Sequence, residues 1–572
     1  MSDYNHADLV LKNGVIYTAD AVESKAEAVA VKNGLIQAVG SNEIINKHVG
    51  PNTRVINLKD RMVLPGMIDS HLHPPGIAIY ELYSINLSWI ASKDKLLEDI
   101  ADFVRNNPNL EAYYGRGWAV SVFEGEERKL GPGKESLDQV CPDAPVALKS
   151  YDGHSMWVNS KALDLVGITD TTPDPEGGSI VRDPSTGEAW GTLKGSACNM
   201  LPPQDFTPEQ LREGLKAFQS FMHSLGYTGI FSAGWDHDLY EAFSTMEADN
   251  ELKLWVRDSK RIDIRKDESL QDQLEQLFNL NRTYRSELYS VTAAKIFIDG
   301  VVESGTARLI EPYTEALGKG SDYRGTYYWE DMDALKDTIV QVNQAEIQVH
   351  FHSIGDQATR DALDALEEAL KIAPGEHRNA ITHLQLVSPQ DLPRFKELGV
   401  IANVQPYWHI KEPGWWHEVD YAFLGERAEK EYPLRSLLIN GAIIASSSDY
   451  PVVDIPNPLW AIQAGVTRNL YQADYFETEP VIDQDDQKWL LNREERISLN
   501  EMIKSFTVNN AYALFIEEST GSIEPGKYAD LVVLSENLFQ LDPVNIDRAK
   551  VCQTIFHGEV VYDAEDEKGS AR

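Results

Sequence analysis

The stretch that decides the fold runs from residue 63 to residue 73 and reads Val63-Leu64-Pro65-Gly66-Met67-Ile68-Asp69-Ser70-His71-Leu72-His73. It begins as an apolar run, which is typical of a buried strand, and it ends in two histidines one residue apart. Because alternate side chains of a strand point to the same face, His71 and His73 can face one point. Neutral imidazole is a common metal ligand, so the pair indicates a metal site. A His-x-His pair also arises by chance, and the rest of the chain must decide.

Between residues 65 and 514, apolar strand-like runs alternate with helical patterns, which predicts βα units around a parallel sheet. One helical pattern is an apolar stripe at the 3.6-residue period, formed by Ala358, Ala362, Leu363, Leu366 and Leu370. The candidate strands are Met67–His71, Thr228–Ser232, Leu254–Arg257, Ala293–Ile298, Ile347–His352, Ala380–His383, Val400–Gln405 and Ala442–Ser446. These make the eight strands of a TIM-like (β/α)8 barrel, an α/β fold.

Two further parts surround this predicted barrel. The gap from about residue 74 to 227 is too long for one connection, so it predicts a large inserted lobe after the first barrel strand, with its own strand at Val146–Ser150. Residues 1–64 and 515–572 read as short strands, with Asn13-Gly14 and Asn33-Gly34 as hairpin signals. The last strands fold back at their own tight turn within Val551–Tyr562. We therefore expect one small β-sandwich domain built from both chain termini.

Composition narrows the class of protein. The chain has 572 residues with 52 Lys+Arg and 90 Asp+Glu, a net charge of -38. Such a surface repels phosphate backbones and anionic lipid, so we expect no nucleic-acid or membrane partner and a small-molecule substrate. The three cysteines are far apart, which indicates neither a disulfide framework nor a metal knuckle. No secretory signal and no apolar run near ~20 residues are visible, so we expect a cytoplasmic protein.

Metal-ligand residues stand at the ends of several predicted strands. In a (β/α)8 barrel the active groups lie at the carboxyl ends of the strands. The first strand ends in the two histidines, and the others contribute Lys295, His352, His383 and Asp449. His350 shares a face with His352 by spacing, either as a neighbour of the site or as a packed core histidine. This register is much harder to obtain by chance than any single motif, and it predicts one shared metal site.

Seven stretches extend the pattern over nearly the whole chain: 65–73, 152–163, 295–300, 352–356, 382–383, 448–452 and 521–533. Through them the sequence resembles the amidohydrolase superfamily, specifically its amidohydrolase-3 (YtcJ-like) branch, which includes N-substituted formamide deformylase. The resemblance implies a metal-dependent hydrolase of non-peptide C–N bonds, acting on an amide or N-substituted formamide, and a homodimer. It also implies a more buried metal bound by His71, His73 and Asp449, and a second metal bound by His352 and His383.

The resemblance also implies a role for Lys295. A free ammonium is a poor ligand because its lone pair is protonated at neutral pH. The resemblance implies that CO2 converts Lys295 to a carbamate that bridges both metals. The alternative is a barrel lysine paired with a carboxylate such as Asp299, with one metal instead of two. We expect zinc, one or two ions per chain, with manganese or iron as alternatives.

The implied mechanism begins with a metal-bound water, whose pKa falls from ~15.7 towards ~7. The resulting hydroxide attacks the amide carbonyl, and Asp449 acts as general base and then as general acid. His154 is the second candidate catalytic residue, as a hydrogen-bond donor to the substrate or oxyanion. The aromatic stretch at residues 405–416 supplies the candidate substrate contacts Tyr407 and Trp415, either as a pocket wall or as a packed loop. Trp118 and Arg308 are further candidates of the same kind.

Two other functions stay open at this point. The same metal site can hydrolyse an ester or lactone, or deaminate a ring. Deaminases of the superfamily typically use one metal and lack the bridging lysine, so Lys295 favours the two-metal hydrolase. The other possibility is a non-catalytic regulatory protein that kept the barrel, which metal analysis would reveal.

Overall fold

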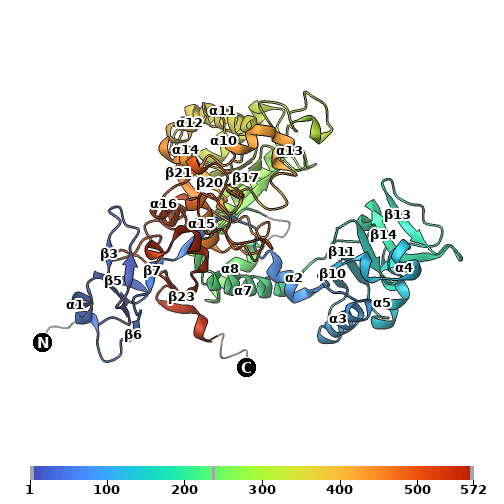
Figure 1. Cartoon of the computed structure of the whole chain (residues 1–572), viewed down its shortest axis with the longest axis horizontal. Helices are drawn as coiled ribbons and strands as arrows, with labels where there is room; N and C mark the ends of the chain where they lie inside the picture. The colour runs from blue at the N-terminus through green and yellow to red at the C-terminus, as the bar shows by residue number, and fades with distance from the viewer. Residues whose placement is uncertain (1–5, 235–238, 567–572) are drawn as a thin grey trace. The chain divides into compact units, whose positions relative to one another are not determined.

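The computed structural model describes residues 6–234 and 239–566, and it divides into two compact units. One unit joins the residues up to Pro74 with those from Gln219 onward, and the other is Pro75–Phe218. The first unit contains the barrel and the sheets formed by the two ends of the chain (Figure 1). Among the described residues, no helix has both the length and the apolar character needed to cross a bilayer.

The barrel is one sheet of eight parallel strands whose order in space follows their order in the chain. Two hydrogen bonds join the first strand to the end of the last strand. The Ser70 hydroxyl donates to the Ser446 carbonyl (3.0 Å), and the Asp449 amide donates to the His71 carbonyl (2.8 Å). This arrangement confirms the predicted TIM-like barrel. The strands are β8 (Met67–Leu72), β15 (Tyr227–Ser232), β16 (Trp255–Ile262), β17 (Tyr289–Phe297), β18 (Gln348–Ser353), β19 (Ala380–His383), β20 (Ile401–Val404) and β21 (Ile443–Ser446).

Helices cover the outside of this sheet. Helices α10 (Met332–Gln344) and α11 (Asp356–Ile372) pack beside β18, while α17 (Val508–Ala513) lies against β8 (Figure 1). The buried face of α11 includes the alanines and leucines of the predicted stripe, such as Ala362 and Leu366. Burying one such leucine contributes roughly 1.5–3 kcal/mol, which is how an amphipathic helix is fixed on the sheet.

Two barrel strands are longer than their apolar runs predict. β16 continues through polar residues to Ile262, and β17 begins four residues before the predicted start at Ala293. The extensions hold because their polar groups find partners on neighbouring strands. The Tyr289 hydroxyl donates to the Asp258 carboxylate (3.0 Å), and the Ser259 hydroxyl donates to the Ser232 carbonyl (2.9 Å). Apolar pattern alone therefore misplaced these boundaries, since satisfied polar groups are tolerated in a buried strand.

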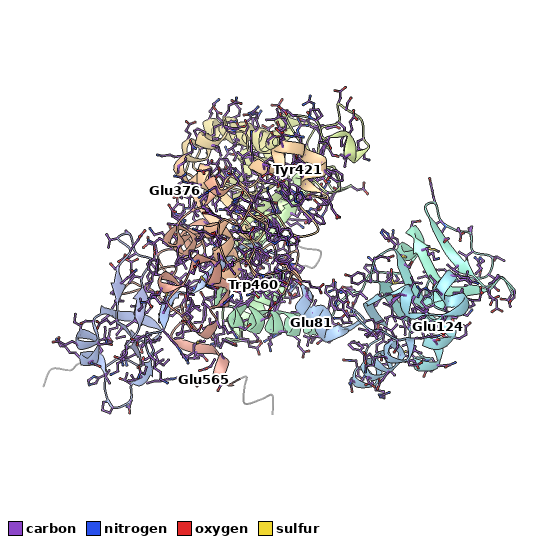
Figure 2. All side chains as sticks on the ribbon, in the orientation of Figure 1. Glu81, Glu124, Glu376, Tyr421, Trp460 and Glu565 are labelled. Carbon is purple, nitrogen blue, oxygen red and sulfur yellow. The ribbon has the colours of Figure 1, made fainter. Side chains whose placement is uncertain are left out.

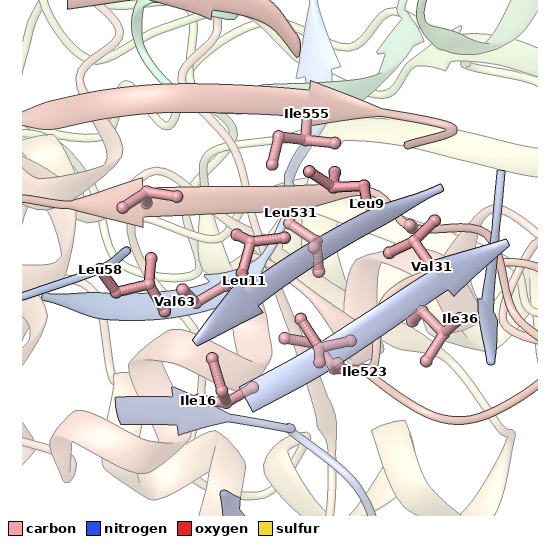
Figure 3. Packing of buried hydrophobic residues seen from close by; sticks show 13 residues of the cluster. Leu9, Leu11, Ile16, Val31, Ile36, Leu58, Val63, Ile523, Leu531 and Ile555 are labelled. Carbon is pink, nitrogen blue, oxygen red and sulfur yellow. The ribbon is translucent and has the colours of Figure 1, made fainter. Parts of the chain in front are cut away.

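The two ends of the chain form two sheets that share one apolar core (Figure 3). Leu11, Val31, Val63, Leu531 and Ile555 meet in this core, although they come from opposite ends of the chain. One sheet has the order β5 (Leu35–Gly40), β4 (Ala28–Lys32), β1 (Leu9–Lys12), β6 (Arg54–Asn57). The other has the order β24 (Glu559–Asp563), β23 (Val551–Phe556), β22 (Leu531–Leu534), β7 (Met62–Pro65), β2 (Val15–Tyr17), β3 (Lys25–Ala26).

The hairpins of these sheets differ in part from the prediction. β4 and β5 pair antiparallel around Asn33-Gly34, and β23 pairs antiparallel with β24, as expected. The predicted hairpin at Asn13-Gly14 is wrong, because β1 and β2 belong to different sheets. Asn13 adopts a positive φ of 60° there, so the same turn chemistry makes a corner between sheets.

Only Gly66 separates β7 of the terminal sheet from β8 of the barrel. A β-carbon at this position would overlap the Thr228 side chain, so the junction requires glycine. The chain thus passes from the terminal sheet to the barrel sheet at a single residue, Gly66. This junction positions His71 and His73 at the carboxyl end of the first barrel strand.

The inserted unit, Pro75–Phe218, has its own mixed sheet and its own core. The contact boundary falls inside α7 (Pro208–Ser224), several residues before the sequence-based limit at residue 227. Figure 2 labels Glu124 in this unit. Its sheet order is β13 (Gly178–Arg182), β14 (Ala189–Gly195), β12 (Ser155–Val158), β11 (Val146–Ser150), β10 (Tyr113–Trp118), β9 (Ser84–Asn86).

Candidate metal centre

The carboxyl ends of the barrel strands open into a cavity of about 650 Å³. Six predicted ligand residues line this cavity. They come from five barrel strands or from the segments just after those strands. They are His71, His73, Lys295, His352, His383 and Asp449. The barrel geometry explains the convergence, since every parallel strand delivers its last side chains to the same end.

Three of these groups lie close enough to share one ion. The Oδ1 atom of Asp449 lies 3.3 Å from His71 Nε2 and 3.1 Å from His73 Nε2. Within residues 6–234 and 239–566, this trio is the only group of three His, Cys, Asp or Glu ligand atoms within 4.8 Å of one another. Asp449 Oδ1 is buried and makes no well-formed hydrogen bond in the described chain. A buried oxygen without a donor is costly, and a cation would satisfy it.

Three histidines each place one ring nitrogen at hydrogen-bond distance from an oxygen outside the metal site. The other ring nitrogen of each remains available to bind a metal. Such outer contacts fix the tautomer and orientation of metal-binding imidazoles. The two rings of the second predicted group also pack edge to face with centroids 4.5 Å apart. The contacts are His73 Nδ1 to Gly234 O (3.1 Å), His352 Nε2 to Gly300 O (3.1 Å) and His383 Nδ1 to the Gln405 side-chain oxygen (2.9 Å).

His350 supports His71 from behind. Its Nε2 lies 2.7 Å from His71 Nδ1, and its ring stacks on Phe231 at 4.6 Å. His350 does not line the cavity. Of the two roles the sequence left open, the structure thus favours a neighbour of the site that orients His71 Nε2 toward Asp449.

Burial keeps His71, His352 and His383 in the neutral form that binds metals. It lowers the pKa of His71 and His383 well below the usual value and that of His352 to about 3, with smaller effects from neighbouring cationic groups. Burial would raise the pKa of Asp449, but contact with His73 and the charges of His383 and Lys295 outweigh it and lower that pKa. Near neutral pH the site therefore offers neutral imidazoles and an ionised carboxylate.

Lys295 is fully buried between these groups. Its Nζ lies 3.1 Å from His71 Nε2, and burial lowers the pKa of this amine to about 7. The alternative pairing with Asp299 is not formed in the described structure. The Asp299 carboxylate instead accepts the backbone N–H groups of Arg308 (2.8 Å), Ile354 (3.0 Å) and Gly355 (2.9 Å). Asp299 thus braces the loops around the cavity, and Lys295 faces the ligand residues.

The predicted substrate contacts have different environments. Trp415 lines the cavity and is 41% exposed. Tyr407 is buried, with its hydroxyl 3.4 Å from that of Tyr227. Arg308 forms an ion pair with Asp361 (2.6 Å), and neither Tyr407 nor Arg308 lines this cavity.

Two other candidates lie in the inserted unit. Trp118 is buried in its core, and the indole N–H donates to the Leu148 carbonyl at 2.7 Å. His154 is exposed on that unit, just before β12. Their contribution to substrate binding or catalysis stays a prediction.

Sequence reasoning missed the carboxylates on the cavity wall. Glu303, Glu412 and Asp420 line the cavity, together with Arg261 and Trp408. They lie in a strand, in connecting segments and at the starts or ends of short helices, so no period or spacing links them. Of the three carboxylates, only Glu412 lies inside the predicted aromatic stretch 405–416.

The amidohydrolase family profile matches residues 54–562 of this chain. The chain belongs to the amidohydrolase family. The predicted resemblance is thereby confirmed, and so is its main consequence, an enzyme that hydrolyses carbon–nitrogen bonds with a divalent metal. The fit of the residues supports the metal independently, through the unsatisfied Asp449 oxygen and the oriented imidazoles.

Several relatives are similar over nearly their whole length. Protein LONG AFTER FAR-RED 3 of Arabidopsis thaliana is 31% identical over 97% of this chain and 92% of its own. Putative amidohydrolase YtcJ of Bacillus subtilis is 30% identical, covering 96% and 98%. N-substituted formamide deformylase of Arthrobacter pascens is 27% identical, covering 97% and 98%. The crystal structure of a metal-dependent hydrolase from Pyrococcus furiosus shares the fold, with a TM-score of 0.71, 24% identity, and 94% and 99% coverage.

Proposed function

We propose that this enzyme hydrolyses the amide bond of a small N-substituted formamide or a related amide. The observation that carries the proposal is the convergence of His71, His73 and Asp449 with Lys295 at the floor of one cavity. The similarity to N-substituted formamide deformylase supports the formamide class. An ester or lactone has the same kind of electrophilic carbonyl and is the second candidate.

Two divalent ions fit the donor set. His71, His73 and Asp449 would hold one, and His352 and His383 would hold the other. Imidazole and carboxylate donors suit zinc, which we propose as the ion, with manganese or iron as the alternatives. When bound, such ions activate water and polarise a carbonyl at neutral pH.

Lys295 is proposed to carry a carbamate. Only the neutral amine reacts with CO2, and burial lowers the pKa of Lys295 to about 7, so a large fraction is neutral at physiological pH. In the described structure Lys295 has no carboxylate partner, while its Nζ lies 3.1 Å from His71 Nε2. A carbamate there would change a buried cation into an anion beside the ligand residues.

Asp449 is proposed to move the proton. Its carboxylate lines the cavity, is ionised near neutral pH and has Oδ1 free of hydrogen bonds in the described chain. In this proposal Asp449 accepts a proton from water and returns it to the leaving nitrogen. General acid–base catalysis of this kind contributes about 10²–10⁴-fold in rate.

The cavity wall is proposed to hold the substituent of the substrate. Phe297, Trp408, Ile410 and Trp415 give it an apolar and aromatic lining. Such a lining positions a substrate by excluding water from the bond to be broken.

The test is a hydrolysis screen with zinc-loaded and manganese-loaded protein. N-substituted formamides, aryl amides, cyclic amides, esters and lactones would be compared by release of acid and amine or alcohol. We expect formate release from a formamide that stops on chelation and returns with metal. Hydrolysis of esters or lactones alone would favour the second candidate, and a folded, metal-loaded protein inactive on every class would refute the proposal.

A further inference from the structure

Three carboxylates on the cavity wall have no cationic partner. Glu303, Glu412 and Asp420 all line the cavity, and across the described residues none of them forms an ion pair with lysine or arginine. Glu303 follows β17, Glu412 follows β20, and Asp420 begins the short helix α13 (Asp420–Leu424). Separate segments therefore bring three carboxyl groups to one wall of a cavity that Arg261 and Lys295 also line, without an ion pair to either of them.

Asp420 is the most confined of the three. It is only 7% exposed, whereas its neighbour Tyr421, labelled in Figure 2, is 42% exposed. The Asp420 Oδ1 atom accepts a hydrogen bond from the Gln385 side-chain amide at 3.1 Å. Its other oxygen has no hydrogen-bond donor among the described residues. A donor that enters the cavity can therefore form a hydrogen bond with this second oxygen.

A fourth carboxyl group lies behind the wall. The amide of Gln385 also donates to Glu431 Oε1 at 2.8 Å, so one side chain bridges Glu431 and Asp420. Burial raises the pKa values of Asp420 and Glu431, and neighbouring carboxylates also raise them. The pKa of Asp420 rises to about 7. The raised values come mainly from burial, and the nearness of other carboxyl groups adds to them.

Aromatic rings accompany these carboxylates. Trp408, Trp415 and Tyr432 line the same cavity. The face of an aromatic ring attracts a cation, and the interaction strengthens when water is excluded. Unpaired carboxylates next to aromatic faces favour an organic cation, which can use both.

The acidic wall does not have the geometry of a further metal site. In the described parts of the chain, only His71, His73 and Asp449 bring three such ligand atoms within 4.8 Å of one another. The carboxylates of the wall are thus too far apart to close around one ion. A larger cation with several N–H donors spans such a spacing better than a bare ion does.

We propose that the substrate carries a protonated amine, which binds among Glu303, Glu412 and Asp420 while its amide group reaches the metal ligands. The substrate class is then an amide or formamide of a diamine or similar aminoalkyl compound. This inference rests on the proposed hydrolytic function and adds the charge of the substituent to it.

The experiment compares matched substrates. One series is N-(ω-aminoalkyl)formamides with linkers of different length, and the other has a methyl group in place of each ammonium. We expect kcat/KM to favour the cationic member of the best pair by about 10-fold to 100-fold, the range expected for a charged hydrogen bond. Glu412→Gln should raise KM for the cationic substrate and so bring this ratio close to one.

Glu426→Gln is the matched control, because Glu426 is exposed and lies outside the cavity. It removes the same charge and should leave the ratio unchanged. Asp420→Asn keeps the acceptor for Gln385 and provides a second variant on the wall. A ratio near one in the wild-type protein, or an equal loss in Glu412→Gln and Glu426→Gln, would overturn the inference.

A binding measurement separates this inference from the proposed function. Trp408 and Trp415 report on the cavity through their fluorescence, with hexylammonium and 1-hexanol as probes. Preferential binding of hexylammonium, weakened in Glu412→Gln, supports a cation site even if no formamide is hydrolysed. Equal binding of the two probes contradicts the cation site even if neutral formamides are good substrates.

Discussion

Replacing Gln405 by leucine should weaken the second metal site without unfolding the protein. Gln405 is fully buried, and its side-chain oxygen lies 2.9 Å from His383 Nδ1. Its amide donates to Thr382, Asn403 and Ser447, but those three side chains also bond to one another through Asn403 Oδ1. Leucine therefore fills the volume and leaves mainly His383 Nδ1 without its partner.

The expected loss follows from that single contact. Removing the outer partner of a metal-binding histidine typically lowers metal affinity 10–100-fold, or about 1.4–2.7 kcal/mol. The assay is a competitive titration of the metal-free protein with zinc against a chromophoric chelator, with thermal unfolding recorded in parallel. Gln357→Leu is the control, because Gln357 contacts Asp361 on α11 and does not line the cavity. Affinity within two-fold of wild type for both ions in a folded Gln405→Leu protein would refute the reasoning.

Three further predictions concern other groups of the site. Asp449→Asn should keep the fold and most of the metal but lose about 10²–10⁴-fold in kcat, and near-normal turnover would remove Asp449 as proton carrier. Lys295→Ala should lower the metal content to one ion or none per chain, measured by elemental analysis, whereas two retained ions would exclude the bridge. Asp420 has a pKa of about 7 in the folded protein and an ordinary value of 3.8, so its burial stabilises the protonated form. Stability is therefore lost as pH rises from about 4 to about 7, and Asp420→Asn should reduce this loss and be more stable than wild type at pH 8. Thermal unfolding at pH 5 and pH 8 tests this, and a variant that is less stable than wild type at pH 8 would contradict it.

The ligand residues were predictable because each follows a strand that its own apolar pattern reveals. His71, His352 and His383 end runs of buried residues, and parallel strands of a barrel deliver their ends to one place. Local pattern and global topology agree at these positions, so spacing along the chain carries information about distance in space.

The same reasoning fails where tertiary contacts override the local pattern. β16 continues past its apolar run because buried partners satisfy Asp258 and Ser259. Asn13-Gly14 has the composition of a hairpin turn, yet sheet packing uses it as a corner. Turn chemistry specifies that the chain bends, but it does not specify which strand is paired afterwards.

The acidic wall was beyond sequence reasoning for a similar reason. Glu303 and Glu412 lie in connecting segments and Asp420 begins the short helix α13, so no regular pattern along the chain links them. In a chain with 90 acidic residues, three more carboxylates in loops give no signal. Only the folded loops bring these carboxylates to one cavity.

The most direct test of the metal centre is a crystal structure of zinc-supplemented protein with diffraction recorded on both sides of the zinc absorption edge. We predict one anomalous peak between His71, His73 and Asp449, a second beside His352 and His383, and continuous density from Lys295 towards both. Zinc bound only elsewhere on the protein, or no zinc in the cavity of folded, supplemented protein, would contradict the account.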